Sequence, residues 1–185
     1  MQRLASLALM LEMTPGRGEI IGDSPDRTVE LLAELDAVHA TISRFSAGRD
    51  GADLHVHREH TDVFVVLDGT LTLKVEGGAR AVGAGTIVLV PPMVAHGFRN
   101  ASDADVTYVN LHMPGTGFGD YMRGLRDRQR VPFDQFDPPA DGAGVRPADE
   151  IVIAPSPVAV GGLPVVLDAD GTVTVGDQLR ITPKT

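Results

Sequence analysis

Short runs of β-branched and aliphatic residues, separated by tight turns, constrain the fold of this chain more than any other feature. Val63–Leu67 and Leu71–Glu76 flank the pair Asp68–Gly69. A second pair, Gly77–Gly78, follows directly. Asp-Gly and Gly-Gly pairs reach the positive φ values that two-residue hairpin turns require. Strands this short, joined by turns this tight, predict an all-β sandwich or barrel.

The same pattern continues on both sides of this hairpin region. Further strands are predicted at Glu19–Gly22, Thr28–Glu34, Val38–Phe45, Thr86–Val90 and Asp105–Met113. In Asp105–Met113, Tyr108 shares one face with Asn110 and His112, while Val109, Leu111 and Met113 share the other. The first face would line a polar pocket and the second would fill a core, and the sequence leaves both arrangements open.

Three histidines and one aspartate are spaced as ligands of a shared metal ion. His55 and His57 lie two residues apart in a segment of strand character, so both imidazoles project from the same face. Asp62 opens the next β-branched run, and His96 follows a Pro-Pro turn. We therefore predict that His55, His57, Asp62 and His96 form one metal site.

These ligand types narrow the choice of metal. Imidazole suits Zn, Cu, Fe and Ni, and a carboxylate is accepted by all of them and by Mn. The chain has no cysteine, so no thiolate favours softer metals. The predicted cofactor is one divalent transition metal ion (Fe, Mn, Ni, Cu or Zn) with positions left open for water, substrate or oxygen. His60 is predicted to face solvent, and it is the substitute ligand if Asp62 falls short of the metal.

The order and spacing of these residues resemble the two sequence motifs of the cupin family. The first motif is matched by His55, His57, Asp62 and Gly69, and the second by Gly85, Pro91, His96 and Asn100. The resemblance covers roughly the central third of the chain. It implies a double-stranded β-helix, the jelly-roll barrel of cupins.

Two positions depart from the family pattern. Asp62 stands where the family has glutamate, and its shorter side chain must start closer to the metal or reach it through water. Met93 stands where the second motif has glycine, which predicts an altered turn and an apolar side chain near the mouth of the barrel.

Resemblance to single-domain bacterial cupins, including quercetinase-like proteins, implies a metal-dependent dioxygenase that acts on a small organic substrate. The same site would also serve an isomerase, lyase or decarboxylase without redox change. The alternative is a barrel that binds a small ligand or a metal without turnover. The residues do not separate these functions, and they identify no catalytic residue besides the metal ligands.

Further side chains are candidates for the pocket wall. They are Arg44, Met93, Phe98, Tyr108, Asn110 and His112. Packing in a core or contact with another subunit is an equally good role for several of them.

One helix and a β-rich tail are predicted after the barrel. Phe118, Tyr121, Met122 and Leu125 have the spacing of an amphipathic helix within 118–130, with its arginines facing solvent. The Pro-, Asp- and Gly-rich stretch 131–148 is typical of a loop, and short β runs follow it. We expect an N-terminal arm, helical or disordered, over 1–15, a cupin barrel with its helix over 16–130, and a loop with a β-extension over 131–185.

Composition and missing motifs exclude several other functions. A formal net charge of −9 argues against a nucleic-acid partner. No segment approaches the ~20 apolar residues of a membrane-spanning helix. The sequence contains no serine-hydrolase elbow, phosphate-binding loop or dinucleotide fingerprint. We expect a cytoplasmic protein whose partner is a small molecule, and the family resemblance implies a homodimer.

Overall fold

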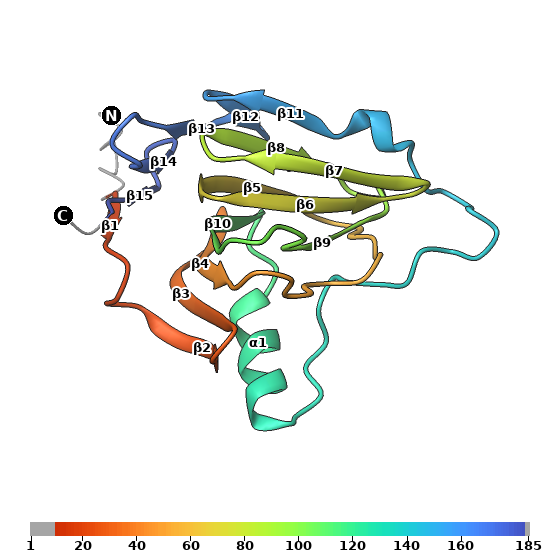
Figure 1. Cartoon of the computed structure of the whole chain (residues 1–185), viewed down its shortest axis with the longest axis horizontal. Coiled ribbons are helices and arrows are strands. Elements are labelled where there is room, and N and C mark those ends of the chain that lie inside the picture. The colour runs from red at the N-terminus through yellow and green to blue at the C-terminus, as the bar shows by residue number, and fades with distance from the viewer. Residues whose placement is uncertain (1–9, 184–185) are drawn as a thin grey trace, which may run out of the picture.

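The structure is a computed structural model that describes residues 10–183, and it is dominated by antiparallel strands (Figure 1). The strands are β1 (Leu11–Met13), β2 (Glu19–Ser24), β3 (Arg27–Leu35), β4 (Val38–Phe45), β5 (Thr61–Asp68), β6 (Thr70–Val75), β7 (Gly78–Gly83), β8 (Thr86–Val90), β9 (His96–Arg99), β10 (Val106–Met113), β11 (Val152–Pro155), β12 (Val158–Val160), β13 (Leu163–Leu167), β14 (Val173–Val175) and β15 (Leu179–Ile181). The helix α1 spans Phe118–Asp127, and a 3-10 turn, η1, spans Ala148–Glu150. The predicted all-β fold is confirmed.

Two facing sheets form the barrel. The larger has the strand order β11-β8-β5-β10-β4-β3-β2, and the smaller has the order β7-β6-β9. Leu71 and Leu73 on β6 pack against Phe64 and Val66 on β5, and all four side chains are fully buried. This interior core is the inside of the double-stranded β-helix, and the predicted jelly roll is confirmed.

A third sheet, formed mainly by the C-terminal residues, covers the outer face of the larger sheet. Its strand order is β1-β15-β14-β13-β12. Val165 and Leu179 from this sheet share a second buried core with Val63 on β5 and Val109 and Leu111 on β10. The tail therefore packs on the barrel, and its strand β11 also extends the larger sheet by pairing with β8, as expected of a β-rich tail.

Both predicted glycine turns are present, but only the turn at Gly77 joins paired strands, β6 and β7. Strands β5 and β6 lie in different sheets, so the hairpin predicted across Asp68–Gly69 is wrong and that turn leads the chain from one sheet to the other. Gly69, between β5 and β6, has φ 74°, and Gly77, between β6 and β7, has φ 76°. Strand β7 was not predicted, because its sequence, GARAVG, has weak β propensity and no regular apolar alternation.

The N-terminal prediction is tested only in part. Residues 1–9 lie outside the described residues, so the helix or arm predicted there is not described. Residues Leu11–Met13 form strand β1, which pairs in parallel with β15. This segment therefore joins the C-terminal sheet and is not helical.

Helix α1 lies at one end of the barrel (Figure 1). Met122 is buried, and Phe118 and Tyr121 pack against the interior core, as the amphipathic pattern predicts. Arg123, predicted to face solvent, instead forms ion pairs with Glu19 on β2 and Glu34 on β3. Within residues 10–183, no helix has the length and apolar character that crossing a membrane requires.

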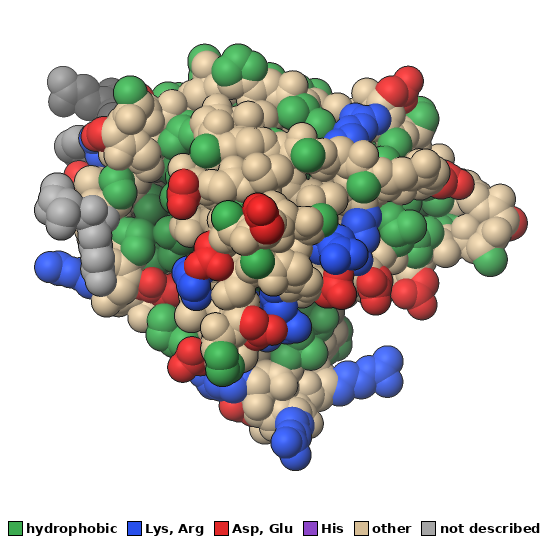
Figure 2. Space-filling view, in the orientation of Figure 1, with side chains coloured by type: hydrophobic (Ala, Val, Ile, Leu, Met, Phe, Trp, Pro, Cys, Tyr) green, Lys and Arg blue, Asp and Glu red, His purple; other side chains and the backbone are tan. Residues whose placement is uncertain are grey.

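Acidic and basic side chains are mixed over the face shown in Figure 2, and no histidine is visible there. Five of the six histidines are buried: His55, His57, His60, His96 and His112. Burial of an imidazole costs free energy unless it is hydrogen-bonded or coordinated. The clustering of histidines inside the barrel therefore calls for a specific explanation.

Candidate metal centre and pocket

The HxH segment reaches the barrel interior through backbone pairing with the strand that carries the third histidine. His55 and His96 exchange two backbone hydrogen bonds, at 2.8 and 2.9 Å. The strand predicted around His55 and His57 is reduced to isolated bridges, His55 to His96 and Val56 to Phe136. These bridges still direct both imidazoles to one side, next to His96.

The structure brings the four predicted ligands together. One donor atom from each of His55, His57, Asp62 and His96 lies within 4.8 Å of the donor atoms of the other three. None of these residues exposes more than 4% of its surface. Asp62 Oδ2 lies 3.4 Å from His96 Nε2 and 3.7 Å from His57 Nε2. The shorter aspartate thus reaches the histidines directly from the second position of β5.

The Nδ1 atom of each of the three imidazoles is held by a hydrogen bond to a backbone carbonyl. His55 Nδ1 donates to the Asp53 carbonyl at 2.7 Å, His96 Nδ1 donates to the Val94 carbonyl at 3.0 Å, and His57 Nδ1 donates to the Asp134 carbonyl. A carbonyl only accepts, so these contacts place the proton on Nδ1 and leave the lone pair on Nε2. Such backbone contacts orient histidines that ligate metals.

The Nε2 atoms fit a cation. His55 Nε2 and His57 Nε2 are 3.1 Å apart, yet in their neutral forms neither has a hydrogen to share. Two buried lone pairs at this distance, beside a carboxylate, repel each other unless a positive charge lies between them. Three imidazoles and one carboxylate also match the ligand preference of Fe, Mn, Ni, Cu and Zn. The donor set therefore suits a divalent transition metal ion.

The charges of the site support this fit. Burial favours a neutral Asp62, but His112, His57 and His96 outweigh it and hold the pKa of Asp62 well below its ordinary value. Burial, and then the nearby His96, lower the pKa of His55 to about 3. Burial also opposes charge on His57, but its hydrogen bond to Asp62 prevails and raises its pKa. The site thus offers a carboxylate anion at Asp62 and a bare imidazole nitrogen at His55, while His57 gives up its proton less readily than an ordinary histidine.

Further polar side chains hold the ligands in place through hydrogen bonds, and the sequence did not reveal them. His60 was predicted to face solvent, but it is fully buried, with Nδ1 2.9 Å from Asp134 Oδ2 and Nε2 3.0 Å from His112 Nδ1. The Asp134 carboxylate also accepts the backbone N–H groups of Arg58 and Glu59. Asp134 therefore holds the segment 57–60 in two ways: its backbone carbonyl accepts from His57, and its carboxylate contacts Arg58, Glu59 and His60.

One signal could have identified Asp134. It lies in the FDQFD run at 133–137, within the stretch that was predicted to be a loop. Phe133 and Phe136 are unusual in an exposed linker, and aromatic residues there indicate packing. Phe136 indeed pairs its backbone with Val56 next to the histidines.

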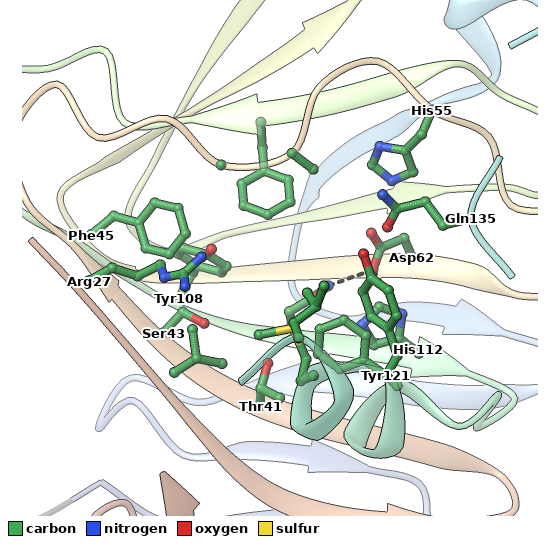
Figure 3. A pocket seen from close by; sticks show the side chains of 18 of the residues that line it. Arg27, Thr41, Ser43, Phe45, His55, Asp62, Tyr108, His112, Tyr121 and Gln135 are labelled. Carbon is green, nitrogen blue, oxygen red and sulfur yellow. Dashed lines mark hydrogen bonds and ion pairs between the residues drawn. The ribbon is translucent and has the colours of Figure 1, made fainter. Parts of the chain in front are cut away.

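A cavity of about 210 Å³ opens beside the ligands (Figure 3). Of the predicted pocket residues it includes Phe98, Tyr108, Asn110 and His112. The polar face of β10 is thus the one that lines the pocket. Residues that the sequence analysis did not single out for the pocket also line it: Arg27, Val29, Thr41, Ser43, Phe45, Gly51, Ala52, Phe118, Tyr121, Met122, Leu125 and Gln135.

Two predicted pocket residues lie elsewhere. Arg44 forms an ion pair with Asp105 and is 45% exposed in its side chain, because its neighbours Ser43 and Phe45 take the inward positions of β4. Met93 adopts φ 65°, the left-handed region that glycine favours, and its side chain lies near Gly144 and outside the pocket. The turn thus keeps the conformation expected of glycine while carrying methionine.

Comparison with known proteins agrees with this geometry. Residues 41–112, which include all four predicted ligands, match the family model described as Cupin domain. The chain carries a cupin domain. The two predicted motifs lie inside the matched stretch, and its last residue, His112, ends the polar row that lines the pocket.

Several solved structures resemble about half of this chain, at low sequence identity. KdgF from Halomonas sp. has 20% identity and a TM-score of 0.49, with 56% of this chain and 94% of that chain covered. An RmlC-like cupin from Shewanella frigidimarina has 26% identity and a TM-score of 0.46, with 53% and 85% covered. The nickel(II) complex of the bacterial pirin YhhW from Escherichia coli has 16% identity and a TM-score of 0.46, with 50% and 47% covered. No protein of curated function matches the sequence.

Proposed function

We propose that this protein is a metal-dependent enzyme of the dioxygenase type, acting on a small organic substrate. One observation carries the proposal: the ligand set His55, His57, Asp62 and His96 is buried inside the barrel and borders a cavity. A metal enclosed only for stability would have no need of an adjoining space. When bound, the ion would supply Lewis acidity and, if it is Fe, Mn, Ni or Cu, redox chemistry.

The residues of the chain would divide the work around that ion. Asp53, Val94 and Asp134 orient the three imidazoles through their carbonyls. Asn110 donates its amide to Asp62 Oδ1 and fixes the carboxylate. The aromatic side chains of Phe118 and Tyr121 from α1 would keep water out of the cavity and pack against the body of the substrate.

The cavity size limits the substrate. Pockets for drug-sized ligands measure about 300–1,000 Å³, and this cavity is smaller, at about 210 Å³. Single-ring catechols and short β-diketones are therefore better candidates than flavonols.

The test has two stages. Elemental analysis of protein purified without added metal should find near-stoichiometric Fe, Mn, Ni, Cu or Zn, and should find little in His55→Ala and His96→Ala. Oxygen consumption is then measured with catechols, β-diketones and flavonols. Uptake that depends on the bound metal supports the dioxygenase. Bound metal without oxygen uptake across the panel favours an isomerase, a lyase or a binding protein. Absence of metal under every loading condition refutes the proposal.

His112 favours a metal-dependent isomerase or lyase as the second candidate. Its ring lines the cavity, and its buried Nε2 has no hydrogen-bond partner among residues 10–183. Burial lowers its pKa to about 3, so the ring is neutral at pH 7 and is a weak base that could take a proton only from a strongly acidified substrate. Exchange of substrate hydrogen with deuterated water, lost in His112→Gln while metal content is kept, would identify this chemistry. A binding protein without turnover would show neither activity.

The homodimer stays a prediction that light scattering can test.

A further inference from the structure

Arg27 lines the pocket, and within the described residues 10–183 it forms no ion pair with a carboxylate. Six other arginines form ion pairs: Arg44, Arg49, Arg99, Arg123, Arg126 and Arg146. Among residues 10–183, no carboxylate lies within 4.0 Å of the Arg27 guanidinium, and its buried Nε has no hydrogen-bond partner. A buried N–H without a partner costs free energy. The Nε atoms of Arg49 and Arg99 also lack a hydrogen-bond partner, but both of these arginines form ion pairs and neither lines the cavity.

Arg27 lies at the end of the cavity away from the metal ligands. It begins β3 opposite Phe45 on β4, and the next inward residue of β4, Ser43, is opposite Tyr108 on β10. At the other end of β10, His112 is opposite Asp62. The four residue steps from Tyr108 to His112 correspond to about 13 Å of strand. Figure 3 shows Arg27 beside Tyr108 and Phe45, with Asp62, His55 and His112 on the far side.

The wall between these two ends is mostly apolar. Phe98 and Tyr121 contribute aromatic rings, and Val29, Met122 and Leu125 contribute aliphatic groups. A ligand that fills the cavity would therefore carry an apolar body with a polar group at each end.

The chemistry at the Arg27 end selects an anion. A guanidinium binds a carboxylate through two parallel N–H···O bonds, and this pairing is stronger than a neutral hydrogen bond. Ser43 and Tyr108 place hydroxyl groups on the same part of the wall. Burial raises the pKa of Tyr108, so its phenol keeps its proton and remains a donor.

From this arrangement we infer that the pocket binds a small organic monocarboxylate, with its carboxylate on Arg27 and its other end at the metal. The inference rests on the proposed function for the metal end, whereas the Arg27 end stands on its own geometry. It narrows the substrate class to acids with an apolar middle.

The test separates the two ends. Suberate monohydroxamate carries a metal-binding hydroxamate at one end and a carboxylate at the other, and its monoamide analogue lacks the charge. Calorimetry with zinc-loaded protein should show the acid binding at least about tenfold more tightly than the amide. Arg27→Gln should remove this preference, and Arg27→Lys should keep part of it. Arg44→Gln, an arginine outside the pocket, should leave it unchanged.

A second measurement needs no metal. Octanoate and octanamide are titrated into metal-free protein, and octanoate should bind at least about tenfold more tightly in the wild type but not in Arg27→Gln. Circular dichroism verifies that each variant is folded. Equal binding of acid and amide to the wild type, or an acid preference that survives Arg27→Gln, overturns the inference. Failure of the protein to bind any of the five metals, with the octanoate preference intact, refutes only the proposed function.

Discussion

The two faces of strand β10 show how one segment serves two different cores. Tyr108, Asn110 and His112 point into the barrel, where they line the cavity beside the metal ligands. Val109 and Leu111 point to the opposite side and are fully buried under the C-terminal sheet. The inner face carries polar groups with specific partners, and the outer face carries only aliphatic groups.

This difference separates function from stability. The outer core gains its free energy from buried apolar area, at roughly 25 cal/mol per Å². The inner cluster of imidazoles and a carboxylate gains little in that way, because each polar group must recover its lost hydration through a partner. We therefore expect substitutions on the inner face to change binding and substitutions on the outer face to change folding.

The largest effect is expected from His96→Ala. The substitution removes one of three converging Nε2 atoms and leaves His55 and Asp62 without their common partner. Bound metal should fall from near one ion per chain to near zero in elemental analysis. Leu111→Ala, on the outer face, is the matched control and should keep its metal. Loss of metal in both variants would contradict the separation of the two cores.

Next in size is the cost of a cavity in the outer core. Leu179 is fully buried between the C-terminal sheet and the barrel, so Leu179→Ala should lower the free energy of unfolding by about 2–5 kcal/mol. Urea denaturation measures this change. Ile20→Ala, at a side chain that is 48% exposed, should cost less than about 0.5 kcal/mol. A small effect at Leu179 would mean that the tail contributes little to folding.

A smaller effect is expected from Asp134, whose hydrogen bonds support the ligands. Asp134→Ala removes the carboxylate that holds His60 and the N–H groups of Arg58 and Glu59. Metal affinity, measured by competition with a chelator, should weaken about 10- to 100-fold. Asp137→Ala, at an exposed position three residues further on, should leave the affinity unchanged. Equal affinities in the two variants would show that the Asp134 carboxylate does not support the metal ligands.

Metal affinity is expected to depend on pH, because the inner face carries titratable ligands and the outer face carries none. Asp62 raises the pKa of His57 despite burial, so His57 in the metal-free protein takes up a proton earlier than an ordinary histidine as the pH falls. A metal must displace that proton, and its affinity should weaken about tenfold per pH unit below the raised pKa. Calorimetry in buffers of different ionisation enthalpy should detect the released proton. Binding that is independent of pH would argue against His57 as a ligand.

The smallest effect is expected at Met93. Its φ of 65° is strained for a side chain with a Cβ, so Met93→Gly should raise the free energy of unfolding by about 1 kcal/mol. Metal content should not change, because the Met93 side chain lies outside the pocket and its N–H still donates to the His57 carbonyl. A loss of stability would mean that the contact near Gly144 outweighs the strain.

Much of the barrel could be predicted because its signals are local. The Asp68–Gly69 turn, the alternation in β4 and β10, and the apolar run in β8 each depend on neighbouring residues. The spacing of four residues also predicted a site that the structure does bring together: His55, His57, Asp62 and His96. The alternation of side chains along a strand did not show that Arg44 faces outward, because a long charged side chain is compatible with either face until the strand pairing is known.

The sequence by itself determined most barrel strands and their glycine turns, the ligand spacing and the amphipathic helix, because periodicity and turn chemistry act over a few residues. Only the tertiary structure decided that Asp134 reaches back to His57, that Arg27 faces the cavity, and that both faces of β10 are buried. Those facts depend on contacts between residues far apart in the chain. Such contacts form when apolar faces exclude water, and no local pattern encodes which distant segment will cover them.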